Sequence, residues 1–412
     1  MTATSAAKRD TKVIGVVSLA HGCSHFYQLA LPPLFPLIHA QESYDYAELG
    51  AVVVALYLAS ALCQPAAGFL VDRFGARSML LGGLAIQAGA TALIGVLPFY
   101  EALIVLAIAV GIGNSVYHPC DYSVMSATIT EQRLGRAYSF HMLGGYLGYA
   151  LAPAAMTVLG TALGWQSAIT VVGLAGFAAL AVVAAGSGDF RDSRHEKRAE
   201  TRAGGRTKAK AGEIFGVLFQ GPILLCWLFF AFMAMAQIGL QSKSVSILSL
   251  PDTYAIGIET AGRILTAFLL ATALGVMCGG YIAERFSRHD AVVAVGYGIS
   301  ALLMLALWRL TPPAEIIFAI YIATGFIYGL AYPSRDIIVR NATPKESSGK
   351  VFGFVYSGMD FGSLVTPALF GWLIDTGASR YAFLCIAILW IISIFVLKAS
   401  GAASSRRSPA RA

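Results

Sequence analysis

Long apolar stretches follow one another along most of the chain, and short segments between them contain most of the charged residues. A helix rises 1.5 Å per residue, so about 20 apolar residues cross the roughly 30 Å of hydrocarbon in a membrane. Helices are the expected spanning element, because short alternating strands would indicate a barrel instead. We predict twelve spans, near 13–38, 47–70, 79–98, 101–127, 136–162, 166–188, 214–241, 258–283, 290–310, 314–341, 350–375 and 380–399.

A charged segment separates the first six predicted spans from the last six. Its Lys, Arg, Gly and Ala content is typical of a solvated linker. We therefore predict an all-α integral membrane protein with two pseudo-symmetric six-helix bundles. The expected parts are an N-terminal bundle at 1–188, a basic cytoplasmic linker at 189–213, a C-terminal bundle at 214–399 and a cytoplasmic tail at 400–412.

Composition agrees with this class. Of the 412 residues, 57% are hydrophobic and only 12% are charged, whereas about a quarter of the residues in soluble domains are charged. Most of the 29 Lys and Arg residues fall on one side if both termini and the linker are cytoplasmic, as the positive-inside rule requires. The net charge of +7 therefore reflects topology, and we expect no nucleic-acid partner.

The sequence offers little to an enzyme. Its six cysteines stand singly, without the CxxC spacing of a zinc site or a redox pair. A phosphate-binding P-loop, a zinc-protease helix and a compact nucleophile motif are all absent from the sequence. We therefore expect neither an enzyme nor a resident cofactor or metal.

The two halves resemble each other. "GFLVDRFGAR" from Gly68 matches "GYIAERFSR" from Gly280 at an offset of 212 residues, and "GIGNSVYHP" from Gly111 matches "GFIYGLAYP" from Gly325 at an offset of 214. One six-span unit is thus repeated in parallel orientation. Repeats of this kind place a binding site near the membrane midplane between two bundles that rock about it.

The first of these segments resembles the signature loop between spans 2 and 3 of the major facilitator superfamily. Ala76 departs from the pattern. The positions that fit it are Gly68, Leu70, Asp72, Arg73, Gly75 and Arg77. The resemblance implies a conformational latch, in which Asp72 favours the positive N-terminus of a facing helix and the basic residues bind acidic or phospholipid groups. Glu284 and Arg285 take the matching places in the second half. Alternatively, Arg73 and Arg77 only anchor the topology.

A finer resemblance points to the fosmidomycin-resistance-type transporters. It rests on "SLAH", "GIGNSVYHP" and "GGYLGYALAP", with matches at His21, Tyr117, His118, Pro119, Gly144, Gly145 and Pro153. The usual acidic residue after His-Pro is replaced by Cys120, with Asp121 following. Members of this subgroup expel small antibiotics or organic anions against a proton gradient.

Ionisable side chains inside the predicted spans are candidates for function, because such groups are costly in lipid. Asp360 lies roughly 15 Å into its span at 1.5 Å per residue, either as a proton carrier or as a structural hydrogen-bond acceptor. Lys243 and Arg263 lie toward the periplasmic ends of their spans. With Arg335 they favour an anionic substrate group, although Lys243 alone fits better as a side chain that snorkels to the interface.

Asp121 and Arg335 occupy equivalent positions in the repeat. They form an inner gate if they pair across the cavity. Alternatively, Arg335 binds an anionic substrate while Asp121 exchanges a proton. A pair between the neighbours Arg335 and Asp336 is a further alternative, although consecutive helical residues point apart.

Histidines are concentrated in the first predicted span. His21 and His25 are four residues apart and share a helix face with Gln28. They relay protons or bind substrate, form a metal pair that needs distant ligands such as His118 or Asp121, or serve only as buried hydrogen-bonding groups. Pro119 predicts a kinked, partly unwound turn in the fourth span.

These features predict a secondary active transporter of the cytoplasmic membrane. We expect proton-coupled export, by alternating access, of a small anionic organic compound such as a drug or phosphonate. Uptake of a small organic acid by proton symport and transport of a metal ion are the alternatives. The expected partners are substrate, protons and lipid, and the expected state is a monomer. The residues assigned to the substrate and proton pathway are His21, His25, Tyr27, Gln28, Asn114, His118, Asp121, Lys243, Arg263, Arg335, Asp336 and Asp360.

Overall fold

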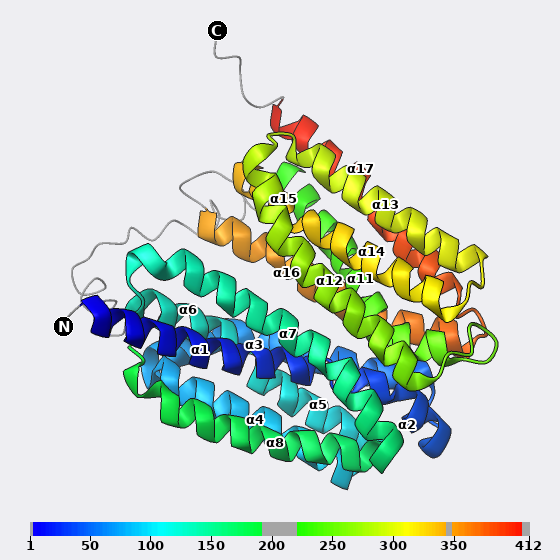
Figure 1. Ribbon diagram of the computed structural model, residues 1–412, viewed down its shortest axis with the longest axis horizontal. Coiled ribbons are helices and arrows are strands. Elements are labelled where there is room, and N and C mark those ends of the chain that lie inside the picture. Colours follow the sequence, from blue (N-terminus) through cyan, green and yellow to red (C-terminus); the bar gives the residue numbers. More distant parts are fainter. Residues whose placement is uncertain (1–2, 192–220, 343–347, 406–412) are drawn as a thin grey trace. The chain divides into compact units, whose positions relative to one another are not determined.

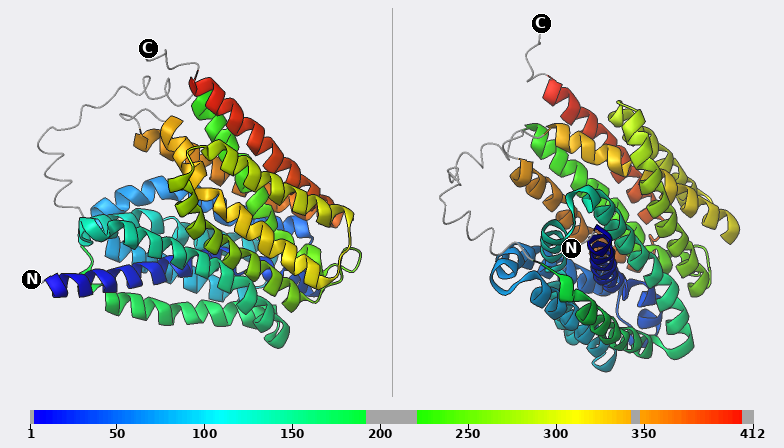
Figure 2. Two further views of the ribbon diagram at one scale, coloured as in Figure 1. Left: turned by 45° about the horizontal axis from the view of Figure 1, so that its top comes forward. Right: turned by 60° about the vertical axis from the view of Figure 1, so that its left-hand side comes forward.

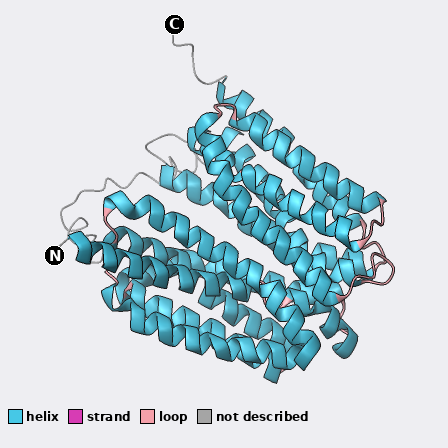
Figure 3. Cartoon of the chain, viewed as in Figure 1, coloured by secondary structure: helices cyan, strands magenta, loops and turns pink. Residues whose placement is uncertain are grey.

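The computed structural model describes residues 3–191, 221–342 and 348–405, and these residues form helices joined by short loops (Figure 3). The chain divides into two compact units. Unit 1 contains Met1–Ser43 and Ala51–Thr207, and unit 2 contains Tyr44–Gly50 and Lys208–Ala412. The predicted linker lies outside the described residues from position 192 onward.

Unit 1 is a bundle in which α1 lies against α7, and α4 against α8 (Figures 1 and 2). The start of α3 groups with unit 2, and the rest of that helix with unit 1. The elements from the N-terminus are α1 (Ala3–Gln28), η1 (Pro32–Leu34), α2 (Phe35–Glu42), α3 (Tyr46–Phe74), α4 (Ala76–Val96), α5 (Tyr100–Asn114), α6 (Tyr117–Thr128), α7 (Glu131–Leu163), α8 (Trp165–Gly186) and η2 (Ser187–Asp189).

Unit 2 repeats this arrangement with α11 against α16 and α13 against α17, and α12 also lies against α14 (Figures 1 and 2). Its described elements are α11 (Gly221–Ser249), α12 (Ile258–Arg285), α13 (His289–Arg309), α14 (Ala314–Leu330), α15 (Tyr332–Ala342), α16 (Ser348–Asp375) and α17 (Tyr381–Ser405).

Within the described residues, 10 helical stretches are long and apolar enough to cross a membrane. The pairs α5–α6 and α14–α15 each form one such stretch. The helices α1 and α16 are not among the 10. Both contain polar side chains inside their predicted spans, including His25 in α1 and Asp360 in α16.

Three of the predicted spans are broken. The span predicted at 13–38 leaves helical geometry after Gln28 and continues through η1 into α2. Pro32 and Pro33 open η1, where they fix the backbone and supply no N–H to an α-helical ladder. The first span is therefore two helices joined by a proline-rich turn.

The spans predicted at 101–127 and 314–341 break at equivalent places, between α5 and α6 and between α14 and α15. In each case a proline, Pro119 or Pro333, lies in the first turn of the new helix. A missing N–H is harmless there, because the first-turn N–H groups have no intrahelical partner, whereas it would disrupt a helix interior. Proline thus places both breaks, one of which the sequence predicts.

Glycines bring equivalent helices into close contact in both units. A Cβ added at Gly144 would lie 2.6 Å from the carbonyl oxygen of Ser18 on α1, and one at Gly148 would overlap the carbonyl oxygen of Gly22. In unit 2, Gly358 and Gly362 of α16 pack in the same way on the backbone of α11. The α1–α7 and α11–α16 pairs are therefore counterparts, and only glycine allows this separation between helix backbones.

Candidate functional site

Four imidazoles and one carboxylate meet in unit 1. They come from three helices: His21 and His25 from α1, His118 and Asp121 from α6, and His141 from α7. The His21 ring centroid lies 3.7 Å from that of His141, 4.4 Å from that of His25 and 5.4 Å from that of His118. We call this group the imidazole cluster.

Asp121 provides the negative charge of the imidazole cluster. Its Oδ2 lies 3.2 Å from Nδ1 of His21 and 3.8 Å from Nδ1 of His141. The side chain of Asp121 is fully buried, those of His21 and His141 are nearly so, and His118 is exposed. The cluster is thus enclosed on the side of α1 and α7 and reachable through His118.

A hydrogen-bonded network lies next to the cluster and is centred on Asn114, the last residue of α5. The Asn114 Oδ1 accepts from Ser24 Oγ at 2.6 Å and from Gln28 Nε2 at 3.0 Å, and its Nδ2 donates to Ser60 Oγ at 2.9 Å. The Tyr149 hydroxyl donates to Gln28 Oε1 at 2.8 Å. One amide at a helix break therefore joins α1, α3 and α5.

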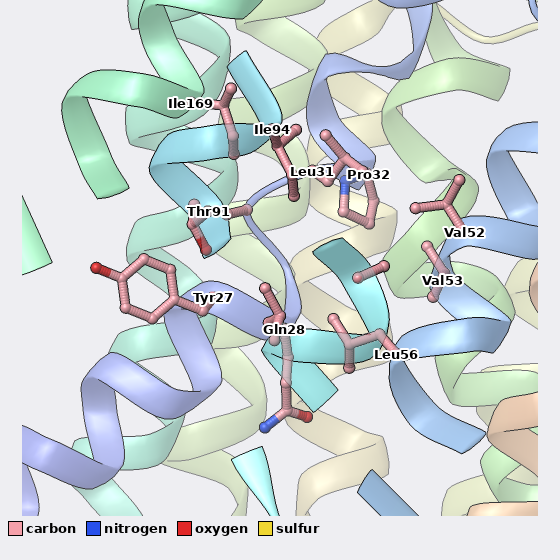
Figure 4. Close-up of a pocket in the computed structure, with 13 residues that line it drawn as sticks. Tyr27, Gln28, Leu31, Pro32, Val52, Val53, Leu56, Thr91, Ile94 and Ile169 are labelled. Carbon is pink, nitrogen blue, oxygen red and sulfur yellow. The ribbon is translucent and has the colours of Figure 1, made fainter. Parts of the chain in front are cut away.

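Tyr27 and Gln28 also border a small cavity of about 20 Å³ inside unit 1. Figure 4 shows its lining, which is mainly aliphatic and includes Leu31, Pro32 and Leu56. The Tyr27 hydroxyl points elsewhere and donates to the carbonyl oxygen of Val172 at 3.1 Å. The cavity has room for about one water molecule, so it is too small for an organic substrate.

Unit 2 holds a cation in the position where unit 1 holds Asp121. The Arg335 side chain is 4% exposed, and its guanidinium carbon lies 4.0 Å from the ring centroid of Tyr332 and 4.9 Å from that of Phe230. Its Nε donates to Oδ1 of Asp336 at 2.9 Å, and one terminal nitrogen contacts Met233 Sδ at 2.8 Å. We call this group the arginine site.

Arg335 forms an ion pair with Asp336, its neighbour along the chain, which is the alternative that helix geometry disfavours. Consecutive Cβ atoms do point apart, but the guanidinium lies at the end of a long side chain that folds back toward Asp336. Asp121 has the imidazoles of His21 and His141 as its nearest polar neighbours, at 3.2 and 3.8 Å. Each member of the predicted inner gate thus has a partner within its own unit.

The imidazole cluster and the arginine site occupy equivalent backbone positions in the two units. Along α1 and α11 the equivalent residues are 209 apart, as the glycine contacts with α7 and α16 indicate. Along α5–α7 and α14–α16 they are 214 apart. The matched pairs around the two sites are His21 and Phe230, Ser24 and Met233, Gln28 and Gln237, Asn114 and Tyr328, His118 and Tyr332, and Asp121 and Arg335.

Sequence comparison missed the offset of 209, because α1 and α11 share few residues. Gln28 and Gln237, which are 209 residues apart, could have indicated this offset. Gln237 Oε1 accepts from the hydroxyls of Tyr328 and Tyr332 at 3.0 and 2.6 Å, just as Gln28 contacts Asn114. His141 is a member of the imidazole cluster that the sequence analysis did not assign to the pathway.

The remaining predicted pathway residues lie elsewhere. Lys243 does not snorkel: its side chain is fully buried, and its ammonium donates to the backbone carbonyl of Tyr46 at 2.8 Å. Arg263 is exposed and pairs with Glu259 one turn away at 3.3 Å. Asp360 is exposed on α16, and no described residue forms a hydrogen bond or ion pair with its carboxylate.

The predicted latch is described only in part, because the side chain of Asp72 lies outside the described residues. Gly75 joins α3 to α4 with a φ of 93°, a conformation that glycine adopts readily. Arg77 donates to Ser187 Oγ at 2.9 Å, which ties α4 to η2. Arg73 is exposed and lies over the ring of Phe74.

The second copy of the latch contains Glu284 and Arg285, both exposed at the end of α12. The Arg285 guanidinium lies over the ring of Tyr281, 4.3 Å from its centroid. Gly68 and Gly280 have open space where a side chain would stand. The described latch residues are thus mainly exposed.

Comparison with known proteins identifies the family. The family model described as "Major Facilitator Superfamily" matches residues 17–250 and 239–412. The chain belongs to the Major Facilitator Superfamily. It is therefore a multi-pass membrane transporter and not an enzyme.

Individual relatives of this superfamily member agree with that assignment. The chain is 24% identical over 367 residues to the fosmidomycin resistance protein of Escherichia coli (strain K12), which covers 88% of this chain and 87% of the relative. It is 24% identical over 394 residues to a probable sulfoacetate transporter of Cupriavidus necator, with 89% and 88% covered. Among solved structures, an inward-facing, occupied bacterial homologue of the human lysosomal transporter Spinster matches with a TM-score of 0.80 at 13% identity, covering 98% of this chain and 99% of that chain.

Proposed function

We propose that this protein exports a small organic anion across the cytoplasmic membrane in exchange for protons, by alternating access. In this proposal the two units are six-span bundles with both termini cytoplasmic, so that α1 and α16 cross the membrane beside the 10 more apolar stretches. The observation that carries the proposal is the arginine site.

The arginine site is suited to an anion because its cation is buried and held rigidly. Contact with aromatic faces holds the plane of a guanidinium in place. Its paired N–H donors can then bind two oxygens of a carboxylate or phosphonate at once. Asp336, which is 43% exposed, already places one carboxylate oxygen on Nε of Arg335. We propose that the anionic group of the substrate displaces Asp336 and makes the same contact.

Asp360 is the proposed proton carrier. It is a carboxylate inside a predicted span, it is accessible, and no described residue forms an ion pair with it. A group in this position takes up and releases protons without first having to break a salt bridge. Asp360 belongs to unit 2, the unit of the arginine site, and we propose that its protonation is coupled to anion release.

The relatives support an anionic or drug-like substrate. One confers resistance to the antibiotic fosmidomycin, and another is a probable transporter of sulfoacetate, an organic anion. The first supports export. Uptake of an organic acid by proton symport is the alternative. The direction in which protons move relative to the anion distinguishes antiport from symport.

The test is transport by the purified protein in proteoliposomes with a pH-sensitive dye inside, using a panel of phosphonates and carboxylates. We expect at least one anion to move protons in the direction of antiport. Arg335→Gln should reduce anion transport about tenfold to a hundredfold, since a hydrogen bond to a charged group contributes about 1.5–3 kcal/mol. Arg335→Lys should be intermediate, because an ammonium keeps the charge but loses the planar fork.

Arg309→Gln is the matched control, because Arg309 is an exposed arginine at the end of α13 in the same unit and was not assigned to the pathway. It should transport normally. Asp360→Asn should retain exchange of labelled anion between the two sides while losing substrate-dependent proton movement. Full coupled transport by both Arg335→Gln and Asp360→Asn would overturn the assignment of these two residues.

A further inference from the structure

The imidazole cluster has no part in the anion transport proposed above, yet it brings together chemistry that packing does not require. One ligand atom each from His21, His118 and His141 lies within 4.8 Å of the other two. Oδ2 of Asp121 lies 3.2 Å from His21 Nδ1 and 3.8 Å from His141 Nδ1. Three ring nitrogens therefore lie close together, and the Asp121 carboxylate lies beside two of the three rings.

Several of these atoms are buried without a hydrogen-bond partner. They are Nδ1 of His21, both ring nitrogens of His141 and both carboxylate oxygens of Asp121. Buried polar atoms normally have a partner, because desolvating them without one is costly. A cation that accepts one lone pair from each imidazole and one from the Asp121 carboxylate would give a partner to one nitrogen of each ring and to one oxygen, and the other nitrogen of each ring keeps its proton.

The equivalent positions of unit 2 show that the fold does not need these side chains. Phe230 stands where unit 1 has His21, Tyr332 where it has His118, and Val355 where it has His141. Phe230 and Val355 are buried in the same helical framework. The imidazoles of unit 1 are therefore not explained by helix packing.

We propose that unit 1 binds one divalent transition metal ion of the zinc class, with four ligands: His21, His118, His141 and Asp121. Neutral imidazole and carboxylate are ligands that Zn²⁺ prefers, and four protein ligands fill a tetrahedral site. Zn–N and Zn–O bonds of about 2.0–2.2 Å place tetrahedral ligands roughly 3.3–3.5 Å apart, close to the separations of Asp121 from His21 and His141. His118 is the exposed ligand, and it gives the ion a way in.

Such a site links helices that are distant in the sequence. His21 belongs to α1, His118 and Asp121 to α6, and His141 to α7. Because the ligands meet only in the folded bundle, metal affinity adds to the stability of that bundle. The ion would be resident in unit 1, and the proposal does not depend on anion transport.

Metal binding is measured on the full chain, purified without a polyhistidine tag and stripped with chelator before Zn²⁺ is added. We expect saturable binding of one Zn²⁺ per chain, a rise of several degrees in Tm and no binding of Mg²⁺, which prefers oxygen ligands. X-ray absorption should show nitrogen and oxygen ligands at about 2.0–2.2 Å.

His118→Ala is the first variant, because an exposed residue can be changed without loss of the fold. It should weaken Zn²⁺ binding at least about a hundredfold, more than the 10–100-fold effect of changes outside the ligand set. Asp121→Asn should do the same. His289→Ala, which removes an imidazole from the start of α13, is the control and should bind Zn²⁺ as the wild type does.

Two results would overturn the proposal. One is wild-type protein that binds no stoichiometric Zn²⁺ and shows no change in Tm, which would mean that the cluster holds only protons. The other is Zn²⁺ binding that is equal in wild type, His118→Ala and Asp121→Asn, which would place the ion elsewhere. Loss of Zn²⁺ binding with anion transport intact would support the site and leave the transport proposal standing.

Discussion

The imidazole cluster of unit 1 and the arginine site of unit 2 occupy the same skeleton with opposite chemistry. Where the first has a carboxylate among imidazoles, the second has a guanidinium among aromatic rings. Apart from the equivalent glutamines Gln28 and Gln237, the features that the two share are backbone features, namely the glycine contacts and the proline-marked breaks. The framework and the chemistry of these sites are therefore determined by different residues and can be tested separately.

The glycine contacts should give the largest effects on stability, in both units. We expect Gly148→Val and Gly362→Val each to destabilise the protein by at least about 3 kcal/mol, because a side chain would overlap the backbone of the facing helix. Thermal unfolding followed by tryptophan fluorescence measures this. Gly68→Ala and Gly280→Ala, which meet open space, are controls, and a tolerated valine in either unit would refute the shared packing.

Removing the two equivalent glutamines tests whether the polar contacts beside the sites are counterparts. Gln28→Leu and Gln237→Leu should each cost about 1–3 kcal/mol, because tyrosine hydroxyls would lose their acceptors. The effect should be larger for Gln28, which also contacts Ser24 and Asn114. Unchanged unfolding temperatures in both variants would argue against this part of the comparison.

One contact of unit 2 involves the start of α3. The Asp375 carboxylate accepts from the backbone N–H groups of Tyr46 and Ala47 at 2.8 and 2.7 Å. Asp375→Ala should lower stability by about 0.5–2 kcal/mol, the usual effect of losing a helix N-terminal acceptor. In unit 1 the acidic residue at the end of α2, Glu42, instead accepts from side chains of α8, so Glu42→Gln should have a smaller effect in the same unfolding assay.

The smallest expected effect concerns acid stability and belongs to unit 1. Burial would raise the pKa of Asp10, but hydrogen bonds from Thr130 and the neighbouring Arg9 outweigh burial and hold it below the usual value. Stability from a lowered pKa is present above about pH 4 and is lost as the pH falls through the pKa of the folded state. Asp10→Asn should therefore unfold more easily at pH 6, by less than about 1 kcal/mol, and its difference from the wild type should shrink as the pH falls toward 3.

The control for the acid effect is Asp189→Asn, because Asp189 forms an exposed ion pair with Lys12. Exposed pairs contribute little, so its unfolding temperature should not change between pH 6 and pH 3 relative to the wild type. A constant difference between Asp10→Asn and the wild type across this range would contradict the proposed role of the charge.

Much of the helical framework could be predicted from the sequence, because it depends on apolar length and on proline. The helix α13 begins and ends within one residue of the predicted span at 290–310. The break near Pro119 was predicted, whereas the equivalent break before Pro333 was not. The break before Pro333 can be predicted only when the two halves are aligned so that Pro333 matches Pro119.

The sites could be predicted less well, for reasons of distance and side-chain length. His21 and His141 are 120 residues apart in sequence, and only the close packing of α1 on α7 brings their rings to 3.7 Å. Lys243 has a long stem that could reach an interface, and the sequence gives no sign of the backbone carbonyl that it contacts instead. Such contacts depend on the tertiary arrangement.

The pair Gln28 and Gln237 has a consequence for how a duplicated protein diverges. A primary amide both donates and accepts, so it can pair with another amide or with a phenol without changing itself. Gln28 contacts Asn114, whereas Gln237 contacts Tyr328 at the equivalent position. After duplication, mutation could therefore replace the partner in one copy while the glutamine still satisfied it, which is a nearly neutral path between two different binding chemistries.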